Sequence, residues 1–207
     1  SSSSPGLVVM KIGQSNPVVG TSTILTATLA FSSDVPAGSL ITLSGLTGSS
    51  SSGAVRVDSS SGLFDTDGDW NGADGILVVG VNAGDSGHGY LAASGVYTFS
   101  FELVHGSVES EGRQVNVGVA VSDPHLGFLQ IAPVAMGGDP VTILGHEDGW
   151  KPLYAFSPST SVVIGQSNNV ASATNMLTIT LALNLDLDAG SKVTLMGLTG
   201  SATGDNL

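Results

Sequence analysis

Residues 96–103 read VYTFSFEL, in which Thr98, Ser100 and Glu102 alternate with aromatic or aliphatic residues. An alternation with a period of two residues predicts a β-strand, here placed at 96–105, that buries one face and exposes the other. Residues 114–121, QVNVGVAV, repeat this pattern. Neither stretch has the period of an amphipathic helix, and no helix is predicted elsewhere. The sequence therefore predicts an all-β fold.

Shorter stretches of the same kind fill the rest of the first 156 residues, each bounded by Gly, Pro, Ser or Asp. They predict strands at 7–12, 22–31, 39–44, 54–58, 75–81, 140–144 and 152–156. Short strands at intervals of about ten residues are typical of two sheets packed face to face. We therefore expect a β-sandwich.

The composition excludes several classes of protein. With 5 Lys and Arg against 17 Asp and Glu, the net charge is −12, so nucleic acids and anionic membranes are expected to repel the chain. No apolar stretch reaches the ~20 residues of a membrane-spanning helix, and Ser-rich residues 1–5 do not resemble a signal peptide. Cysteine is absent, which rules out disulfides and thiolate metal sites. We expect a mature or internal segment without a nucleic-acid partner or a membrane span.

An internal repeat is the strongest signal in the sequence. IGQSN at residues 12–16 returns at 164–168, an offset of 152 residues (164 − 12). The same offset relates AGS at 37–39 to 189–191, LTATLA at 25–30 to LTITLA at 177–182, and GLTGS at 45–49 to 197–201. A period of this length fits one whole domain rather than a turn of a small solenoid.

The repeat sets the expected domain boundaries. We predict a Ser-rich linker at 1–6, one complete repeat at 7–156, a linker at 157–160 marked by Pro158, and the first strands of a second repeat at 161–207. No shorter internal period divides the first repeat, so it is expected to form one sandwich rather than two small domains.

The second copy is predicted to be incomplete. Its alternating stretches at 161–165, 175–183 and 191–196 lack the later strands that would cover them. Exposed apolar faces and unpaired edges invite pairing with another chain. Completion would come from the remainder of the same polypeptide or from strands donated by a neighbouring subunit. The residues expected to make inter-repeat or inter-subunit contacts are Ile164, Gly165, Gln166, Leu177, Ile179 and Leu181.

Several segments, taken together, resemble one family of proteins. They are IGQSN, GLTGS, Phe64 followed by Trp70-Asn71, GILV at 75–78, YTFSF at 97–101 and Pro152-Leu153. In kind and order, and over nearly the whole chain, they are similar to the tandem immunoglobulin-like repeats of algal and protist extracellular proteins. The resemblance implies an immunoglobulin-like sandwich in a secreted fibrous or cell-surface glycoprotein, without catalytic residues. The acidic loop at 65–74 and Gly106-Ser107, where the family tends to have an Asn-Pro turn, depart from the pattern.

The acidic loop, DTDGDWNGAD, is the metal candidate. Its carboxylates stand at alternate positions, an arrangement that can offer several oxygen ligands to calcium. The candidate ligands are Asp65, Asp67, Asp69, Asn71 and Asp74. Trp70 and Ile76 stand where an EF-hand loop has its glycine and its closing glutamate, which favours a solvated turn without metal. No cofactor other than Ca²⁺ at this loop is expected.

The four histidines show no catalytic or metal-binding pattern. His88, His105, His125 and His146 have no metal-ligand spacing and lie in no nucleophile motif. They are expected at surface or strand positions. The tryptophans and tyrosines are expected to pack rather than to stack on sugars. We therefore predict that the chain is not an enzyme.

Serine-rich turns are the candidate sites of O-glycosylation, because no Asn-x-Ser/Thr sequon occurs. The resemblance implies sugars on Ser, Thr or hydroxylated Pro. The candidates are Ser3, Ser4, Pro5, Ser50, Ser51, Ser60, Ser157, Pro158, Ser159 and Thr160. The alternative interpretation is an uncoated flexible turn at each position.

The expected function is structural, as a subunit of an extracellular filament or cell-surface layer. Its partners would be copies of itself and covalently attached O-glycans. The alternative is a calcium-dependent adhesin or a glycan-binding module, which a rise in Tm with calcium or sugar would favour. A hydrolase is a third hypothesis, and turnover of polysaccharides or esters would reveal it.

Overall fold

A computed structural model describes residues 6–84, 89–93, 95–123 and 127–203, and these residues form strands and turns without a helix. The strands are β1 (Leu7–Gln14), β2 (Ser22–Phe31), β3 (Val35–Pro36), β4 (Leu40–Ser44), β5 (Val55–Asp58), β6 (Asp67–Asn71), β7 (Ile76–Gly80), β8 (Tyr90–Leu91), β9 (Val96–Val104), β10 (Ser110–Glu111), β11 (Asn116–Asp123), β12 (Gly127–Ala135), β13 (Tyr154–Ala155), β14 (Thr160–Gln166) and β15 (Leu177–Leu183). The predicted all-β fold is confirmed. No helix that could span a membrane lies in the described part of the chain.

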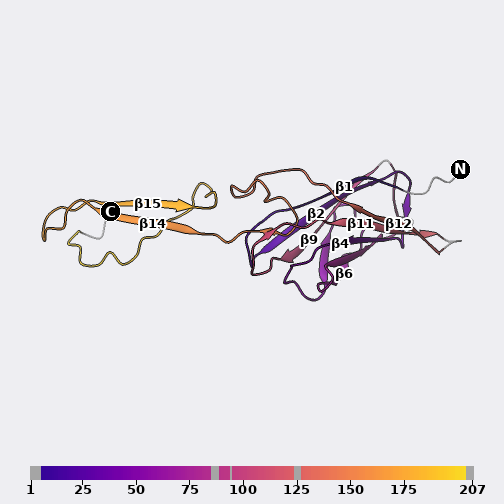
Figure 1. The fold of residues 1–207 in the computed structure, drawn as a ribbon. Coiled ribbons are helices and arrows are strands. Elements are labelled where there is room, and N and C mark those ends of the chain that lie inside the picture. Colours follow the sequence, from indigo (N-terminus) through magenta and orange to yellow (C-terminus); the bar gives the residue numbers. More distant parts are fainter. Residues whose placement is uncertain (1–5, 85–88, 94, 124–126, 204–207) are drawn as a thin grey trace.

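Nine strands form a continuous antiparallel sheet in the order β1-β2-β9-β5-β6-β7-β4-β11-β12. The sheet folds over at β5, where Val57 and Asp58 pair with β9 while Val55 and Arg56 pair with β6. One layer therefore contains β1, β2 and β9, and the other contains β6, β7, β4, β11 and β12 (Figure 1). This arrangement is an immunoglobulin-like β-sandwich.

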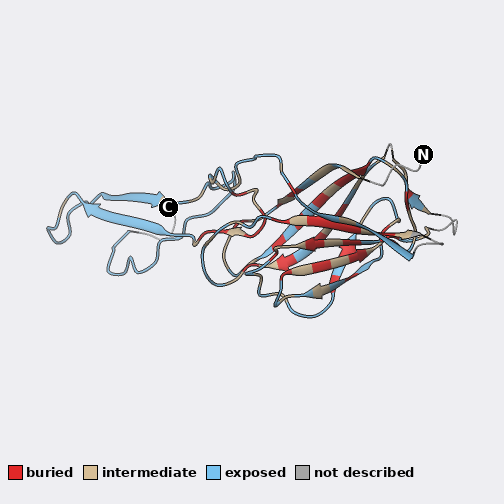
Figure 2. Cartoon of the chain, turned by 45° about the vertical axis from the view of Figure 1, so that its right-hand side comes forward, coloured by how far each residue is buried: buried red, intermediate tan, exposed pale blue. Residues whose placement is uncertain are grey.

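The core lies between the two layers and follows the predicted alternation. Phe99, Phe101 and Leu103 of β9 are buried, and one cluster of buried side chains extends from Ile12 to Leu153. Figure 2 shows buried positions alternating with intermediate or exposed ones along these strands. Because full burial of one such side chain contributes about 1.5–3 kcal/mol, this cluster is the main source of stability.

The outer edge of β1 is covered by the last segment of the repeat. Ile12 N–H donates to Gly137 O (2.9 Å), and Gln14 N–H donates to Trp150 O (3.1 Å). Further along, Phe156 N–H donates to Pro17 O (2.9 Å). The first strand of the repeat is therefore closed by residues more than 120 positions later in the chain.

The predicted strand at 140–144 is wrong: residues 140–142 are irregular, Ile143 forms only a bridge to His146, and Leu144 begins a turn. Pro140 has no N–H to donate to a strand ladder. The strand on this side is instead β12, which pairs with β11 at the end of the sheet. The sequence did not predict β12, because its side chains are largely exposed and show no alternation, and because it contains Pro133. Proline is nevertheless tolerated in an edge strand. The acidic loop also contains an unpredicted strand, β6.

The second copy forms an antiparallel hairpin, β14–β15, in the register of β1–β2. Gln14 pairs with Leu25, and Gln166 pairs with Leu177 at the equivalent position. The hairpin lies apart from the sandwich, and its residues are almost all exposed (Figure 2).

The strand predicted at 191–196 is wrong, because these residues form no strand. Their counterpart in the first copy is β4, which pairs with β7 and β11. The counterparts of β7 and β11 would fall beyond residue 207. Within the described residues, no strand pairs with 191–196, and an alternating sequence alone does not make a strand.

Candidate functional site at the junction between the repeats

The junction, made of residues 143–146, 157–159 and 184–186, joins the sandwich to the second copy. A tight turn supplies its first part: Ile143 and His146 exchange backbone hydrogen bonds of 3.1 and 3.0 Å. Leu144 and Gly145 between them have φ of 52° and 84°, as a type I′ turn requires. This conformation is strained for Leu144, which has a Cβ atom. The turn directs the carbonyl of Leu144 to the second copy, where it accepts from Asp186 N–H (3.1 Å).

His146 links the two copies through both ring nitrogens. Its Nε2 lies 2.9 Å from the carbonyl oxygen of Asn184, and its Nδ1 lies 3.0 Å from the hydroxyl of Tyr154. Because a carbonyl only accepts, Nε2 carries the proton, and in the neutral ring Nδ1 accepts from Tyr154. The ring also stacks on Phe156, with centroids 3.7 Å apart. The imidazole is thus fixed by the first copy and binds the second.

Asn184 holds the linker on both sides of Pro158. Its side-chain oxygen accepts from Ser159 N–H (2.7 Å), and its side-chain nitrogen donates to Ser157 O (2.9 Å). Ser157 N–H in turn donates to a carboxylate oxygen of Glu109 in the sandwich (2.9 Å). The linker is therefore tied to both copies.

The first copy carries a similar clasp at its own start. Gly6 N–H donates to Ser32 Oγ, and Ser32 N–H donates to Gly6 O, both at 2.8 Å. Ser32 is the counterpart of Asn184, 152 positions earlier. The end of β2 and the end of β15 thus each hold the preceding segment, but the residue held differs by one position, since Ser159 corresponds to Leu7 and not to Gly6.

The six residues predicted to make inter-repeat contacts lie elsewhere on the hairpin. Ile164, Gly165, Gln166, Leu177, Ile179 and Leu181 are exposed. The hydrogen bonds that join the copies instead involve His146, Leu144, Asn184 and Asp186, which the sequence analysis missed. Asn184 replaces a serine in the other copy, so the repeat gave no signal for it.

Gln14, the glutamine of IGQSN, joins β1 to the last segment of the sandwich. Its side-chain nitrogen donates to Gly149 O (2.9 Å) and Tyr154 O (2.8 Å), and its side-chain oxygen accepts from Leu153 N–H (2.8 Å). The side chain is buried, whereas its counterpart Gln166 is exposed. The motif therefore marks a structural clamp that is complete only in the first copy.

His105, for which a surface or strand position was expected, is buried directly after β9, where it forms a β-bridge with Ser49. His88 and His125 lie outside the described residues. The Nε2 of His105 donates to Asn16 O at 2.7 Å, and burial lowers the pKa of the imidazole below its usual 6.5, partly opposed by this bond. The folded state thus favours the neutral ring.

We expect acid to destabilise the sandwich through His105. Because the unfolded chain binds the proton more readily, this contribution to stability is complete above pH 6.5 and decreases as the pH falls towards the lowered folded pKa. His105→Gln should reduce the difference in Tm between pH 7.5 and pH 5. Equal differences in the wild type and the variant would contradict the role of His105.

The acidic loop does not converge on one point. Asp67, Asp69 and Asn71 lie at alternate positions of β6, where the strand rise separates neighbours on one face by about 6–7 Å. Asn71 donates to an Asp74 carboxylate oxygen (2.7 Å), and Asp65 pairs through its backbone with Gly80. Among the described residues, no group of three or more His, Asp or Glu could hold a metal ion.

The glycosylation candidates differ in access. Ser3, Ser4 and Pro5 lie outside the described residues. The hydroxyl of Ser50 donates to His105 O (3.0 Å), and that of Ser51 accepts from Val104 N–H (2.7 Å). Ser157 is half-buried. The exposed candidates are Ser50, Ser60, Pro158, Ser159 and Thr160, of which Ser50 has its hydroxyl bonded to the backbone.

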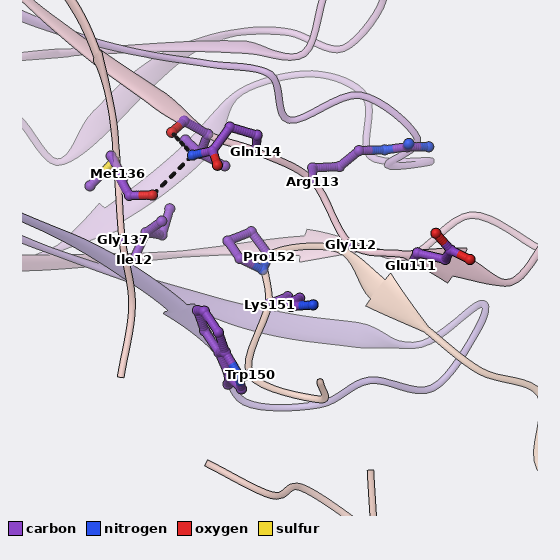
Figure 3. Close-up of a pocket in the computed structure, with 11 residues that line it drawn as sticks. Ile12, Glu111, Gly112, Arg113, Gln114, Met136, Gly137, Trp150, Lys151 and Pro152 are labelled. Atoms are coloured by element: carbon purple, nitrogen blue, oxygen red, sulfur yellow. Dashed lines mark hydrogen bonds between the residues drawn. The ribbon is translucent and has the colours of Figure 1, made fainter. Parts of the chain in front are cut away.

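A pocket of about 210 Å³ lies beside β1, where the last segment covers it (Figure 3). Trp150 and Pro152 form part of its wall. Its amide side chain, Gln114, donates to Val115 O and Met136 O, and Arg113 Nε donates to Thr47 O. Both side chains are therefore hydrogen-bonded to the backbone of the sandwich.

No protein-family model and no curated protein matches the sequence. Similar solved structures include the sixth cohesin of scaffoldin B from Acetivibrio cellulolyticus in complex with a Cel5 dockerin mutant (16% identity, TM-score 0.38), which covers 63% of this chain and 98% of that one. Another is BcpA, the major pilin subunit of Bacillus cereus (10% identity, TM-score 0.41), which covers 88% of this chain and 56% of that one. These distant similarities carry no argument about function. They do not identify the algal and protist repeat family.

Proposed function

We propose that the chain is a structural segment of an extracellular filament or cell-surface layer built from tandem immunoglobulin-like repeats. The observation that carries the proposal is the junction. Two copies of one repeat follow each other, and His146, Leu144, Asn184 and Asp186 join them through specific hydrogen bonds. A junction held at several points transmits force along the chain and keeps successive repeats in one orientation.

Two further features support a tandem array. The start of the first copy has a Gly6–Ser32 clasp that resembles the linker clasp of the second, with the held residue shifted by one position. The hairpin of the second copy also keeps its register while extending away from the sandwich (Figure 1). In this proposal residues 161–207 pack against a further copy along the filament axis, and the junction at Pro158 supplies longitudinal cohesion. The chain acts mechanically and not as an enzyme.

Distance measurements between two spin labels test the stiffness of the junction. Since the chain has no cysteine, Arg56→Cys and Thr180→Cys provide unique labelling positions in the two copies. We expect a narrow distribution of distances, which His146→Ala should broaden because it removes the link to Asn184. Glu147→Ala, at the exposed neighbouring residue, is the control and should leave the distribution narrow. A broad distribution without any junction substitution would overturn the proposal.

Attached sugars are expected on exposed hydroxyls. A transferase needs a free hydroxyl on an accessible turn, so Ser60, Ser159 and Thr160 should carry O-glycans in the native material. Ser50 and Ser51, whose hydroxyls bond to the backbone of β9 and His105, should not. Glycopeptide mass spectrometry measures the occupancy of each site. Sugars found only on Ser50 and Ser51 would contradict the expectation.

A further inference from the structure

Among the described residues, the backbone of β15 is paired on one side only, with β14, and its other side is open. Ser167 N–H donates to Met176 O, as Ser15 N–H donates to Ile24 O in the first copy. Alternate residues of an antiparallel strand direct their N–H and C=O groups to opposite sides. Thr178 and Thr180 therefore bond to β14, whereas the backbone groups of Leu177, Ile179 and Leu181 are directed to the open side.

The first copy shows what fills this side. There β9 pairs with β2 over nine residues, with Leu25 opposite Phe101, Ala27 opposite Phe99 and Leu29 opposite Tyr97. Leu25, Ala27 and Leu29 are fully buried, whereas their counterparts Leu177, Ile179 and Leu181 are 41, 37 and 37% exposed. The β9 of this chain is already paired with β2 and β5, so it is not available to β15.

We propose that the open edge of β15 is the docking site for the β9-type strand of another copy of this repeat. The strand adds antiparallel, in the register of the β2–β9 pair. This inference rests on the proposed tandem-repeat function and specifies the partner of the exposed hairpin.

The register also sets the size of one partner residue. Four positions of β15 correspond to the buried face of β2. Three of them have the same or a similar residue in both strands, but at the fourth Ile179 replaces Ala27. Phe99, which is fully buried opposite Ala27, would be overpacked against Ile179. The strand that docks on β15 therefore has a residue smaller than phenylalanine at this position.

Two peptides test the inference on the full chain: residues 96–104, and the same peptide with Phe99→Val. Amide exchange measured by NMR should show new protection at Leu177, Ile179 and Leu181 and no change at Thr178 and Thr180. The Phe99→Val peptide should bind roughly tenfold more tightly than the native one, as expected when overpacking is relieved. In the Ile179→Ala chain the native peptide should bind more tightly than the Phe99→Val peptide. Thr178→Ala lies on the other face of the strand, so in that chain the Phe99→Val peptide should still bind more tightly.

Absence of protection would overturn the docking site, and equal affinity of both peptides for both chains would overturn the register. Sedimentation of the chain without peptide provides a further test. A dimer that Ile179→Lys abolishes and Thr178→Lys preserves would show that a second β15 occupies the edge instead. The peptide and sedimentation tests use the unlabelled chain and report on the edge of β15, not on the junction, so a failure here is distinguishable from a failure of the proposed function.

Discussion

Gln14→Ala is expected to lower the free energy of unfolding of the sandwich by roughly 3–5 kcal/mol. The substitution leaves Gly149 O, Tyr154 O and Leu153 N–H without the partner that now binds them inside the protein. Each buried polar group left unsatisfied costs about 1–3 kcal/mol. For a chain of this size the loss corresponds to a fall in Tm of the order of 10 °C. Urea denaturation and calorimetry measure both quantities.

The second copy supplies the control for this prediction. Gln166→Ala changes the same motif where the side chain is exposed, so it should change the unfolding free energy by less than about 0.5 kcal/mol. Gln14→Leu restores the volume but not the hydrogen bonds and should remain destabilising. Full recovery in Gln14→Leu would show that packing, rather than hydrogen bonding, makes Gln14 important.

Gly45→Ala is expected to destabilise the sandwich by roughly 2–4 kcal/mol. Gly45 has φ of 95°, a conformation that costs a residue with a Cβ atom about 1–2 kcal/mol. The added Cβ would also lie 2.3 Å from the carbonyl oxygen of Gln114, so backbone would have to shift. Overpacking of this kind adds about 1–3 kcal/mol.

Gly197→Ala is the control, because Gly197 lies outside the sandwich. Gly197 has the same place in GLTGS and a φ of 84°, but nothing lies within 4 Å of the position of its Cβ. It should change the unfolding of the sandwich by less than about 0.5 kcal/mol. Parallel thermal melts of the two variants measure the difference. Similar losses in both would mean that the loss does not come from the place of Gly45 in the sandwich.

Strands with one buried face could be predicted from the sequence, because burial imposes the alternation that is visible in β2, β9 and β11. β12 could not, since an exposed edge strand places no such demand on its side chains. The error at 191–196 has the opposite cause. Its pattern is that of β4, but a strand also needs neighbours to accept its hydrogen bonds.

The site was less predictable than the fold. His146 binds the carbonyl of Asn184, 38 residues away, and neither residue stands in a pattern that links them. Gln14 did leave a signal. It stands two positions after Ile12 in a strand with a period of two, so its amide faces inward and requires buried partners.

The exchange of Ala27 for Ile179 bears on how a tandem protein folds without exchanging segments between neighbours. Adjacent repeats with similar sequences can misassemble during synthesis, when equivalent hairpins compete for one acceptor strand. A β14–β15 hairpin that displaced β1–β2 would place Ile179 against Phe99, in a space that alanine fills. The larger side chain therefore disfavours the swapped product, and Ile179 helps each hairpin to pack within its own repeat.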